Sequence, residues 1–292
     1  MRIGIAGLGK MGAAIAQRLQ ETGAEIVVWN RSRAKAEALG VPVADTPRAL
    51  AEQADVIISM LFDAASVHAV YHDPDGILSA GLAGKLVVEM TTVRPQVQQD
   101  LAEAVRKRGG AFVECPVGGT TGPARTGKLL GLAGGEEHDV ARARPVLDLL
   151  CRRVEHVGPV GAGASLKLAI NLPLLVFWQS FGEALALVRH LNLDPIWLVE
   201  FFAETSGGPN VLKTRAAPIA KALAGEDPGP VTFDIDSIRK DLRTIVEEAA
   251  SRGFTAPVSA QALASFDEAE AAGLGKQDCS RLPARWAAKA HP

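Results

Sequence analysis

The chain has 292 residues, of which 48% are hydrophobic, and this length and composition suffice for two domains with sizeable cores. Because the formal net charge is only −2, the charge balance does not favour binding to nucleic acid or to an acidic membrane surface. Cys115, Cys151 and Cys279 are too few and too scattered for a disulfide framework or a zinc site, so no metal is expected and the chain fits a reducing cytoplasm.

The first 30 residues predict a dinucleotide-binding unit. Strands are expected over residues 2–7 and 25–30, with a helix between them, and the sequence GLGKMG opens that helix. In this strand–helix–strand setting, G-x-G-x-x-G is typical of a dinucleotide site. Its three glycines serve the tight turn, the approach of the pyrophosphate and close helix–strand packing in turn, and the helix start would bind the phosphates. We therefore predict these cofactor-binding residues: Gly7, Leu8, Gly9, Lys10, Met11 and Gly12.

The residues after the second predicted strand favour NADP(H) over NAD(H). Proteins that bind NAD usually place Asp or Glu there for the ribose 2′-OH. This chain has Asn30, Arg31, Ser32 and Arg33 instead, and a guanidinium can pair with a 2′-phosphate. We assign Asn30, Arg31 and Ser32 to the cofactor site, with Arg31 as the phosphate partner, because Arg33 can equally face solvent on the next helix.

Further α/β units are predicted as far as residue 160. Strands are expected over 54–61, 85–92, 111–117, 128–135 and 152–159, and helices over 64–71, 95–108 and 137–150. Ligands of open α/β sheets bind at the carboxyl ends of the strands. We therefore expect Met60, Leu61 and Phe62 to contact the cofactor.

Residues 161–191 predict a long apolar helix, about 40 Å in length if unbroken. It is apolar on nearly all sides and therefore predicted to be buried, although four polar residues, Lys167, Asn171, Gln179 and Glu183, distinguish it from a membrane span. Lys167 and Asn171 are four residues apart and so lie on one face. Burying a lysine is costly unless it is paired or used. From spacing alone, Lys167 could equally reach solvent from the helix start.

Beyond residue 191 only helices are predicted, over 195–205, 209–224, 235–252, 257–273 and 280–289. The expected fold class is α/β: a Rossmann-type doubly wound sheet, then a long interdomain helix, then an all-α C-terminal domain. The predicted boundaries are 1–160, 161–191 and 192–292. Within the long helix, Pro173 predicts a kink or an unpaired carbonyl, because proline has no N–H for the carbonyl of Ala169.

Several motifs, in order, resemble those of the β-hydroxyacid dehydrogenase family, the group of 3-hydroxyisobutyrate dehydrogenase, tartronate semialdehyde reductase and the glyoxylate/succinic semialdehyde reductases. The resemblance covers nearly the whole chain. Its most specific element is GAGASLKLAIN (161–171), which follows the pattern G-x-G-x-x-x-K-x-x-x-N. The other matching segments are GLGKMG (7–12), EMTTVRP (89–95), CPVGGTTGPARTG (115–127) and FDIDSIRKDL (233–242).

The resemblance implies reversible hydride transfer between a nicotinamide cofactor and a small, carboxylate-bearing hydroxy acid or its semialdehyde. It makes Lys167 the catalytic acid and base and Asn171 the residue that orients the substrate, and it puts Thr92 and Lys240 beside the nicotinamide. A lysine in that role needs a pKa below its usual value, which burial and the positive end of the helix would supply. The family also implies a homodimer or homotetramer. The substrate-binding segment would comprise Gly118, Gly119, Thr120 and Thr121.

One departure from the family concerns the substrate. The family usually has Ser-Gly-Gly after Pro-Val, whereas this chain has Gly118, Gly119 and Thr120, so the serine hydroxyl for the substrate carboxylate is missing or moved. Thr120 or Thr121 could replace it, and Arg125 could either reach an anion or face solvent. Two alternatives remain. An imine reductase-like enzyme shares this plan but generally has Asp or Tyr as its catalytic residue, and a non-catalytic NADP-binding protein would not need Lys167.

Overall fold

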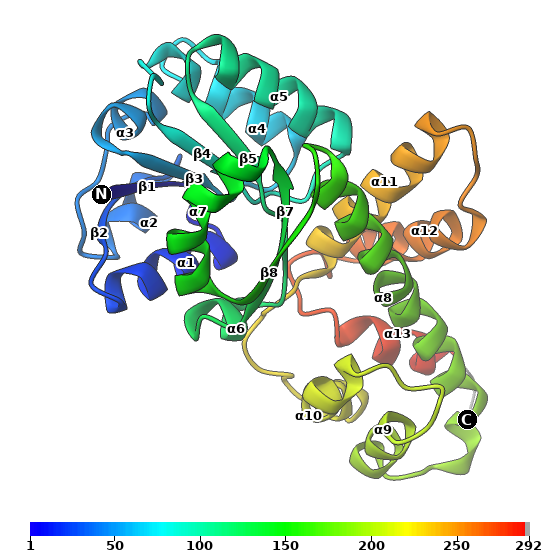
Figure 1. The fold of residues 1–292 in the computed structure, drawn as a ribbon. Helices are drawn as coiled ribbons and strands as arrows, with labels where there is room; N and C mark the ends of the chain where they lie inside the picture. Colours follow the sequence, from blue (N-terminus) through cyan, green and yellow to red (C-terminus); the bar gives the residue numbers. More distant parts are fainter. Residues whose placement is uncertain (290–292) are drawn as a thin grey trace. The chain divides into compact units, whose positions relative to one another are not determined.

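The computed structural model describes residues 1–289 and consists of two compact units, the first ending at Leu168 and the second beginning at Ala169 (Figure 1). The boundary expected at residue 160 lies just before the helix that contains this division. That helix, α8 (Ala162–Leu187), therefore belongs in part to each unit.

Strands and helices alternate through the first unit, as the sequence predicts. The strands are β1 (Arg2–Ala6), β2 (Glu25–Trp29), β3 (Val56–Ser59), β4 (Leu86–Glu89), β5 (Ala111–Glu114), β6 (Val117–Gly118), β7 (Leu129–Gly135) and β8 (Cys151–Gly158). The helices are α1 (Lys10–Glu21), α2 (Arg33–Glu37), α3 (Pro47–Gln53), α4 (Ala64–His72), the short 3₁₀ helix η1 (Ile77–Ser79), α5 (Pro95–Lys107), α6 (Thr121–Arg125) and α7 (Glu137–Leu150). Of these, α3, η1 and α6 were not expected.

The sheet is doubly wound, which confirms the expected Rossmann-type fold. Its strands follow the order β2-β1-β3-β4-β5-β7-β6, and β8 pairs with β7. All pairings from β2 to β5 are parallel, whereas β7 is antiparallel to β5 and β6. The carboxyl ends of five strands therefore lie along one edge, where such folds bind ligands.

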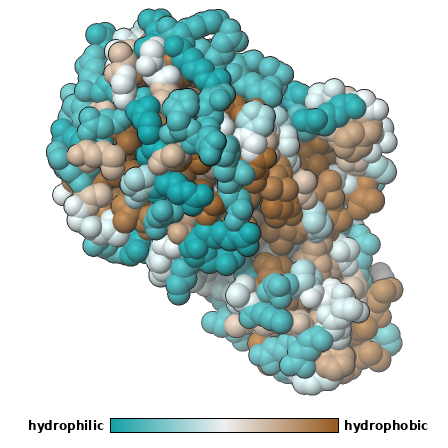
Figure 2. Space-filling view, viewed as in Figure 1, coloured by the Kyte–Doolittle hydropathy of each residue, from teal (hydrophilic) through white to brown (hydrophobic). Residues whose placement is uncertain are grey.

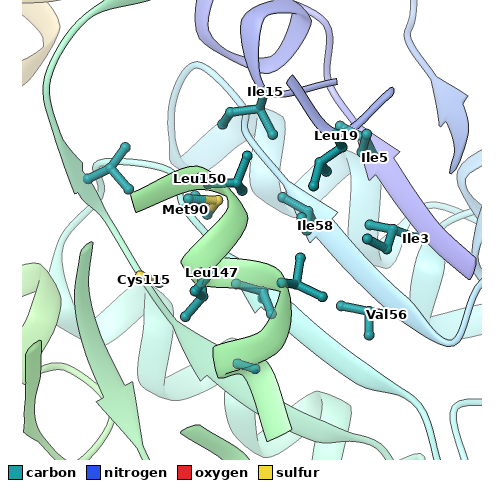
Figure 3. Close-up of a cluster of buried hydrophobic side chains, with 14 of the residues drawn as sticks. Ile3, Ile5, Ile15, Leu19, Val56, Ile58, Met90, Cys115, Leu147 and Leu150 are labelled. Carbon is teal, nitrogen blue, oxygen red and sulfur yellow. The ribbon is translucent and has the colours of Figure 1, made fainter. Parts of the chain in front are cut away.

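Each face of the sheet is covered by its own hydrophobic core. Val56 and Ile58 belong to one core, whereas Ile57 between them belongs to the other, because successive side chains of a strand point to opposite faces. Strands buried on both faces explain the continuous apolar runs in the sequence. Figure 3 shows the first core, to which the sheet, α1 and α7 contribute Ile3, Ile5, Ile58, Ile15, Leu19, Leu147 and Leu150.

Three strands end two or three residues earlier than predicted. The strands expected over 54–61 and 85–92 end at Ser59 and Glu89, so the residues that follow them lie in loops at the carboxyl edge. Beyond β4, the N–H of Thr91 donates to the Glu89 carboxylate instead of continuing the ladder. The strand expected over 111–117 is divided into β5 and β6, because Pro116 has no N–H to offer a neighbouring strand.

The second unit is helical throughout, and residues 169–289 contain no strand, as expected. After α8 come the 3₁₀ helix η2 (Arg189–Leu191), α9 (Pro195–Ala203), α10 (Val211–Leu223), α11 (Ile235–Ser251), α12 (Pro257–Ala271) and α13 (Arg281–Lys289). Asp194 caps α9 by accepting from the Trp197 N–H at 2.8 Å, and Pro195 occupies its first position. The N-cap aspartate and the following proline thus predict the start of α9 correctly.

Helix α8 runs unbroken through Pro173 and ends at Leu187, four residues before the end expected at 191. The chain then tightens into η2, and Asn192 closes it in the left-handed conformation with φ of 50°. A kink at Pro173 stays a prediction. By length and composition α8 is also a candidate membrane span, but a single helix of this kind is weak evidence, because core helices of soluble proteins pass the same test.

A buried ion pair joins parts of the second unit that are far apart in the sequence. Arg215 on α10 donates to both oxygens of Asp278, at 3.0 and 3.1 Å, and Asp278 is only 1% exposed. The N–H groups of Thr232 and Ser280 donate to the same carboxylate. Burial works against this charge, but Arg215 and these N–H groups hold the Asp278 pKa below its usual value.

Candidate active site

The loop between β1 and α1 has the shape that a dinucleotide requires. Gly7 has φ of +95°, and a Cβ on Gly12 would lie 1.9 Å from the Gly7 carbonyl oxygen, so neither position tolerates a side chain. Gly9, in contrast, is exposed, and no atom lies within 4 Å of where its Cβ would be. Gly9 is the N-cap residue of α1 and, as a glycine, accepts no side-chain hydrogen bond from the N–H groups there. The N–H groups at the start of α1 are therefore suited to phosphate.

Asn30 ties this loop to the end of β2. Its Oδ1 accepts the Leu8 N–H at 2.9 Å, and its Nδ2 donates to the Ser32 carbonyl oxygen at 3.0 Å. The carboxamide therefore bonds to the backbone, which makes Asn30 a residue that shapes the loop. Arg33 is engaged by Glu37 at 2.8 Å and Asp45 at 2.5 Å. Arg31 is exposed and belongs to neither ion pair, so it is the guanidinium that can turn towards a ligand.

A second link joins the loops after β3 and β4. The Leu61 N–H donates to Thr91 Oγ1 at 2.9 Å, and that hydroxyl in turn donates to the Glu89 carboxylate. Gln98 on α5 donates to the same carboxylate at 2.7 Å. Burial raises the pKa of Glu89, while the Thr91 and Gln98 hydrogen bonds oppose that rise.

These two loops contain residues predicted to contact the cofactor. Thr91, Glu89 and Gln98 hold the loops in place, and none of the three was predicted to do so. Met60, Leu61 and the exposed Phe62 follow β3, and the half-buried Thr92 follows Thr91. Glu89 is the first residue of the matching segment EMTTVRP. A glutamate at the end of a predicted strand, however, does not by itself predict a hydrogen bond to Thr91.

Helix α8 carries both predicted catalytic residues. Lys167 is half-buried and Asn171, one turn later, is 4% exposed. Asn171 Nδ2 donates to Asp241 Oδ2 at 3.0 Å, and the Lys240 ammonium lies 2.5 Å from Asp241 Oδ1. Because a carboxylate only accepts hydrogen bonds, this contact fixes which end of the Asn171 amide faces Asp241.

Asp241 is a further residue of the candidate site that the sequence reasoning did not select. It is 6% exposed and binds both Asn171 and Lys240. It stands in the segment FDIDSIRKDL, directly after the lysine that was selected. The resemblance named only Lys240, and a sequence separation of 70 residues hides the contact with Asn171.

The segment expected to bind the substrate carboxylate lies at the edge of the sheet. Gly118 ends β6, and Gly119 has φ of +124°. Thr120 occupies the N-cap position of the five-residue α6 without a side-chain cap hydrogen bond, and Thr121 begins that helix. A Cβ on Gly118 would meet Leu130 Cβ at 3.6 Å, an ordinary contact. The chain therefore lacks the family serine here without any steric need for glycine.

Arg125 is not available to an anion in this arrangement, contrary to one possibility raised by the sequence. Its guanidinium binds the Glu21 carboxylate and the Gln17 side chain on α1. Within residues 1–289, no group of three or more His, Cys, Asp or Glu side chains is arranged to hold a metal ion.

Family models match both parts of the chain. Residues 2–158 match the NAD binding domain of 6-phosphogluconate dehydrogenase. Residues 161–285 match a model described as NAD-binding of NADP-dependent 3-hydroxyisobutyrate dehydrogenase. NAD(P) binding thus agrees with the geometry of the Gly7–Gly12 loop.

Curated relatives and solved structures agree over almost the full length. The chain is 30% identical to glyoxylate/succinic semialdehyde reductase 1 of Arabidopsis thaliana (97% of each chain) and 32% identical to 3-hydroxyisobutyrate dehydrogenase of Pseudomonas aeruginosa (96% of this chain, 95% of the relative). The solved structure of Psf3 in complex with NADP+ and 2-OPP is 27% identical, with a TM-score of 0.85 over 97% of this chain and 99% of that one. An imine reductase from Myxococcus stipitatus in complex with NADP+ shares the fold, with 22% identity and a TM-score of 0.64 over 97% and 98% of the two chains.

Proposed function

Since the chain belongs to the β-hydroxyacid dehydrogenase family, whose members are oxidoreductases that bind NAD(P) and act on CH–OH groups, we propose that it interconverts a small β-hydroxy acid and its semialdehyde with NADP(H). Lys167 is the general acid and base of this reaction. The observation that carries the proposal is the pair formed by Lys167 and Asn171 on α8, with Asn171 oriented by Asp241.

The residues of the first unit fit a dinucleotide. The Gly7–Gly12 loop and the start of α1 would hold the pyrophosphate, and the loops that contain Leu61 and Thr92 would flank the nicotinamide. When bound, the cofactor gives hydride to the carbonyl carbon or takes it from the hydroxy carbon. The space above Gly9, which no protein atom occupies within 4 Å of a Cβ position, supports this assignment.

Lys167 moves the proton that balances the hydride. During reduction, its ammonium donates a proton to the carbonyl oxygen as that oxygen becomes an alkoxide. During oxidation, the neutral amine takes the proton from the hydroxyl group. General acid–base catalysis by a positioned side chain contributes about 10² to 10⁴-fold to a rate, so Lys167 is the residue on which turnover depends most.

Asn171 orients the substrate without competing for that proton. An amide neither gains nor loses a proton near neutral pH, and it can still donate and accept hydrogen bonds. Asp241 accepts one Nδ2 hydrogen, which leaves the second hydrogen and Oδ1 for other partners. Lys240, held by the same carboxylate, is the lysine to which the family resemblance gives a role beside the nicotinamide.

The preference for NADP(H) rests on Arg31. No carboxylate follows β2 to bind a ribose 2′-OH, and Arg33 is already paired with Glu37 and Asp45. Arg31 is therefore the group that binds the 2′-phosphate.

The substrate class follows from the relatives and from Gly118. The two relatives are named for glyoxylate, succinic semialdehyde and 3-hydroxyisobutyrate, all small carboxylates. We assign the substrate carboxylate to the segment Gly118–Thr121, where the family serine is absent and the hydroxyls of Thr120 and Thr121 are nearby in sequence. The imine reductase alternative shares only the fold, and Lys167 is unlike the Asp or Tyr expected there.

A second copy of the chain is the proposed partner. In the second unit, large apolar side chains are exposed around the end of α8 and on α9, and Figure 2 shows such side chains on the surface of this unit. Among them, the rings of Trp197 and Phe201 stack at 5.1 Å and are 50% and 52% exposed. We propose a homodimer or homotetramer formed through this surface, as in the family; a monomer at micromolar concentration in light scattering would exclude it.

A substrate panel tests the proposed reaction. Glyoxylate, succinic semialdehyde, tartronate semialdehyde, methylmalonate semialdehyde and a cyclic imine are each supplied with NADPH and with NADH. The proposal expects turnover of at least one semialdehyde or glyoxylate, faster with NADPH. Turnover of the imine alone would favour the imine reductase reading, and binding of NADPH without turnover of any compound would favour a non-catalytic protein.

A further inference from the structure

Glu114, the last residue of β5, connects the sheet to the helix that carries Lys167. Its Oε1 accepts the N–H of Gly161 at 2.7 Å and the N–H of Gly163 at 2.8 Å. The side chain is fully buried, and within residues 1–289 its Oε2 has no hydrogen-bond partner. The proposed reaction has so far assigned no role to this carboxyl.

Three glycines make room for this contact. Gly161 has φ of +101°, which a residue with a side chain rarely adopts. A Cβ on Gly163 would lie 2.3 Å from the Leu132 carbonyl oxygen, and one on Gly134 would lie 2.4 Å from Glu114 Oε1. Both glycines that open the 161–171 motif are therefore required to bring the start of α8 against β7 and the Glu114 carboxyl.

Capping the helix does not by itself require a charge. A glutamine in place of Glu114 would offer the same carbonyl-type acceptor to both N–H groups. Burial raises the pKa of Glu114 to about 7, the N–H groups of Gly161, Gly163 and Ala164 oppose that rise, and the nearby Glu89 adds to it. Near neutral pH the fold thus retains a carboxyl whose ionised form burial disfavours.

We propose that Glu114 is a positioning residue for the reaction assigned to Lys167: its ionised carboxylate fixes the first turn of α8 and thereby the direction of the Lys167 amine. Lys167 follows Gly163 by four residues, which is about one helical turn. A displacement of about 1 Å at a reacting group can cost about 10²-fold in rate, so a small change at Gly161–Gly163 is sufficient to matter. This inference rests on the proposed function.

The ionisable groups around Glu114 come from several elements. Glu89 on β4 is its partner in strand register, and the buried thiol of Cys115 follows it on β5. His156 on β8 bonds through Nε2 to the backbone carbonyl oxygens of Gly135 and Gly158.

Of these neighbours, Glu89 acts directly on the charge of Glu114 and raises its pKa. Protonation of Glu114 replaces a charge-assisted bond to each N–H by a neutral one, which is roughly half as strong. The turn that leads to Lys167 is then held less firmly. The rate of hydride transfer should therefore fall as pH drops through about 7, the value to which burial raises the pKa.

Glu114→Gln tests this directly, because the amide mimics the protonated carboxyl at every pH. The measurement is the single-turnover rate of NADPH oxidation by the best semialdehyde, in wild type and variant, from about pH 6 to about pH 8.5. At the upper end, where wild-type Glu114 is ionised, the variant should be slower by about 10-fold. At the lower end the two rates should converge, with KM for NADPH unchanged throughout.

A merely structural role predicts different results. A wild-type to variant ratio that does not change with pH would overturn the proposal, as would equal rates at about pH 8.5. Glu155→Gln on β8 is the matched control, because its carboxylate pairs with Arg153 at the surface, and it should follow the wild-type profile. Glu114→Ala, which removes the acceptor altogether, should be slow at every pH; if it does not fold, the glutamine variant still decides.

Hydrogen exchange of residues 159–170 provides a readout that needs no activity. Relative to exchange of strands β1–β5, which follows the overall stability, the proposal expects Glu114→Gln to speed exchange in this segment at about pH 8.5 and to leave it unchanged at about pH 6; an unchanged ratio at both would contradict it. If wild type turns over no carbonyl at all, the proposed function fails and the role of Glu114 fails with it. If wild type is active and the pH-dependent ratio is missing, only the role of Glu114 fails.

Discussion

Asn171 on α8 and Asp241 on α11 form a buried hydrogen bond of 3.0 Å between Nδ2 and Oδ2. The same carboxylate lies 2.5 Å from the Lys240 ammonium. One buried aspartate therefore orients two residues to which the family resemblance gives roles, Asn171 beside the substrate and Lys240 beside the nicotinamide. Asp241 itself was not selected from the sequence.

Asp241→Asn should lower kcat by about 10 to 100-fold, because an amide cannot pair with Lys240 as a charge and no longer fixes the direction of the Asn171 amide. Steady-state kinetics with NADPH and the best semialdehyde measure it. Asp267→Asn is the control, because Asp267 is an exposed partner of Arg239 and Arg243 on the surface of the same unit. Equal losses in both variants would mean that the effect is on folding.

Arg31→Ala should raise KM for NADPH by about 10 to 100-fold, the equivalent of one lost charge-assisted hydrogen bond of about 1.5 to 3 kcal/mol. KM for NADH should hardly change, because NADH has no 2′-phosphate. Arg33→Ala is the matched control, since Glu37 and Asp45 already engage that guanidinium. The assignment is wrong if Arg33→Ala shows the larger effect on NADPH.

Gly118→Ser should fit and should improve binding of a carboxylate. The atoms nearest to its Cβ belong to Leu130 and lie at ordinary contact distance. A new hydroxyl hydrogen bond of about 0.5 to 1.5 kcal/mol corresponds to a KM lower by about 2 to 10-fold. If KM for succinic semialdehyde is unchanged or higher, the substrate carboxylate does not bind at this position.

Gly119→Ser, one residue later, should behave in the opposite way. Gly119 has φ of +124°, and its Cβ would lie 2.9 Å from Leu129 Cδ2, so the substitution should lower the free energy of unfolding by about 1 to 2 kcal/mol. Thermal melting of the two serine variants side by side measures this contrast. Similar melting temperatures would show that the backbone at this edge of the sheet adapts.

The pH dependence of stability offers a check on Glu114. The folded-state pKa, raised by burial to about 7, lies above the ordinary value of 4.5, so the folded chain retains a proton that the unfolded chain has released. The stabilising contribution is complete below about pH 4.5 and is lost as pH rises through about 7, by on the order of 3 kcal/mol. The unfolding free energy of wild type, measured relative to that of Glu114→Gln, should therefore fall as pH rises from about 4.5 through about 7. A difference that is constant between about pH 5 and 8 would contradict it.

Local signals made the Gly7–Gly12 loop and the long helix α8 predictable. Gly7 has a positive φ, and a Cβ on Gly12 would clash with the Gly7 carbonyl oxygen, five residues earlier. Both requirements are visible in the spacing of the glycines in the sequence. Lys167 and Asn171 share one helix, so their relationship follows from a separation of four. Asp194 and Pro195 fixed the start of α9 in the same local way.

Contacts between distant segments were not predictable in this way. Glu114 meets Gly161 across 47 residues, and Asp241 meets Asn171 across 70; a lone acidic residue in a motif does not reveal such a partner. The cofactor contact expected of Asn30 stays a prediction, and its carboxamide bonds to the backbone of Leu8 and Ser32. The sequence does not distinguish a polar side chain that binds backbone groups in the folded chain from one that binds a ligand.

The most direct test of the central claim is the single-turnover rate of NADPH oxidation by wild type, Lys167→Ala and Lys128→Ala, with the semialdehyde that wild type reduces fastest. Lys128 is an exposed lysine of the first unit and serves as the control. If Lys167 gives the proton, its removal should slow hydride transfer by about 10² to 10⁴-fold, with NADPH binding retained and Lys128→Ala at the wild-type rate. A Lys167→Ala enzyme that transfers hydride at the wild-type rate would contradict the account.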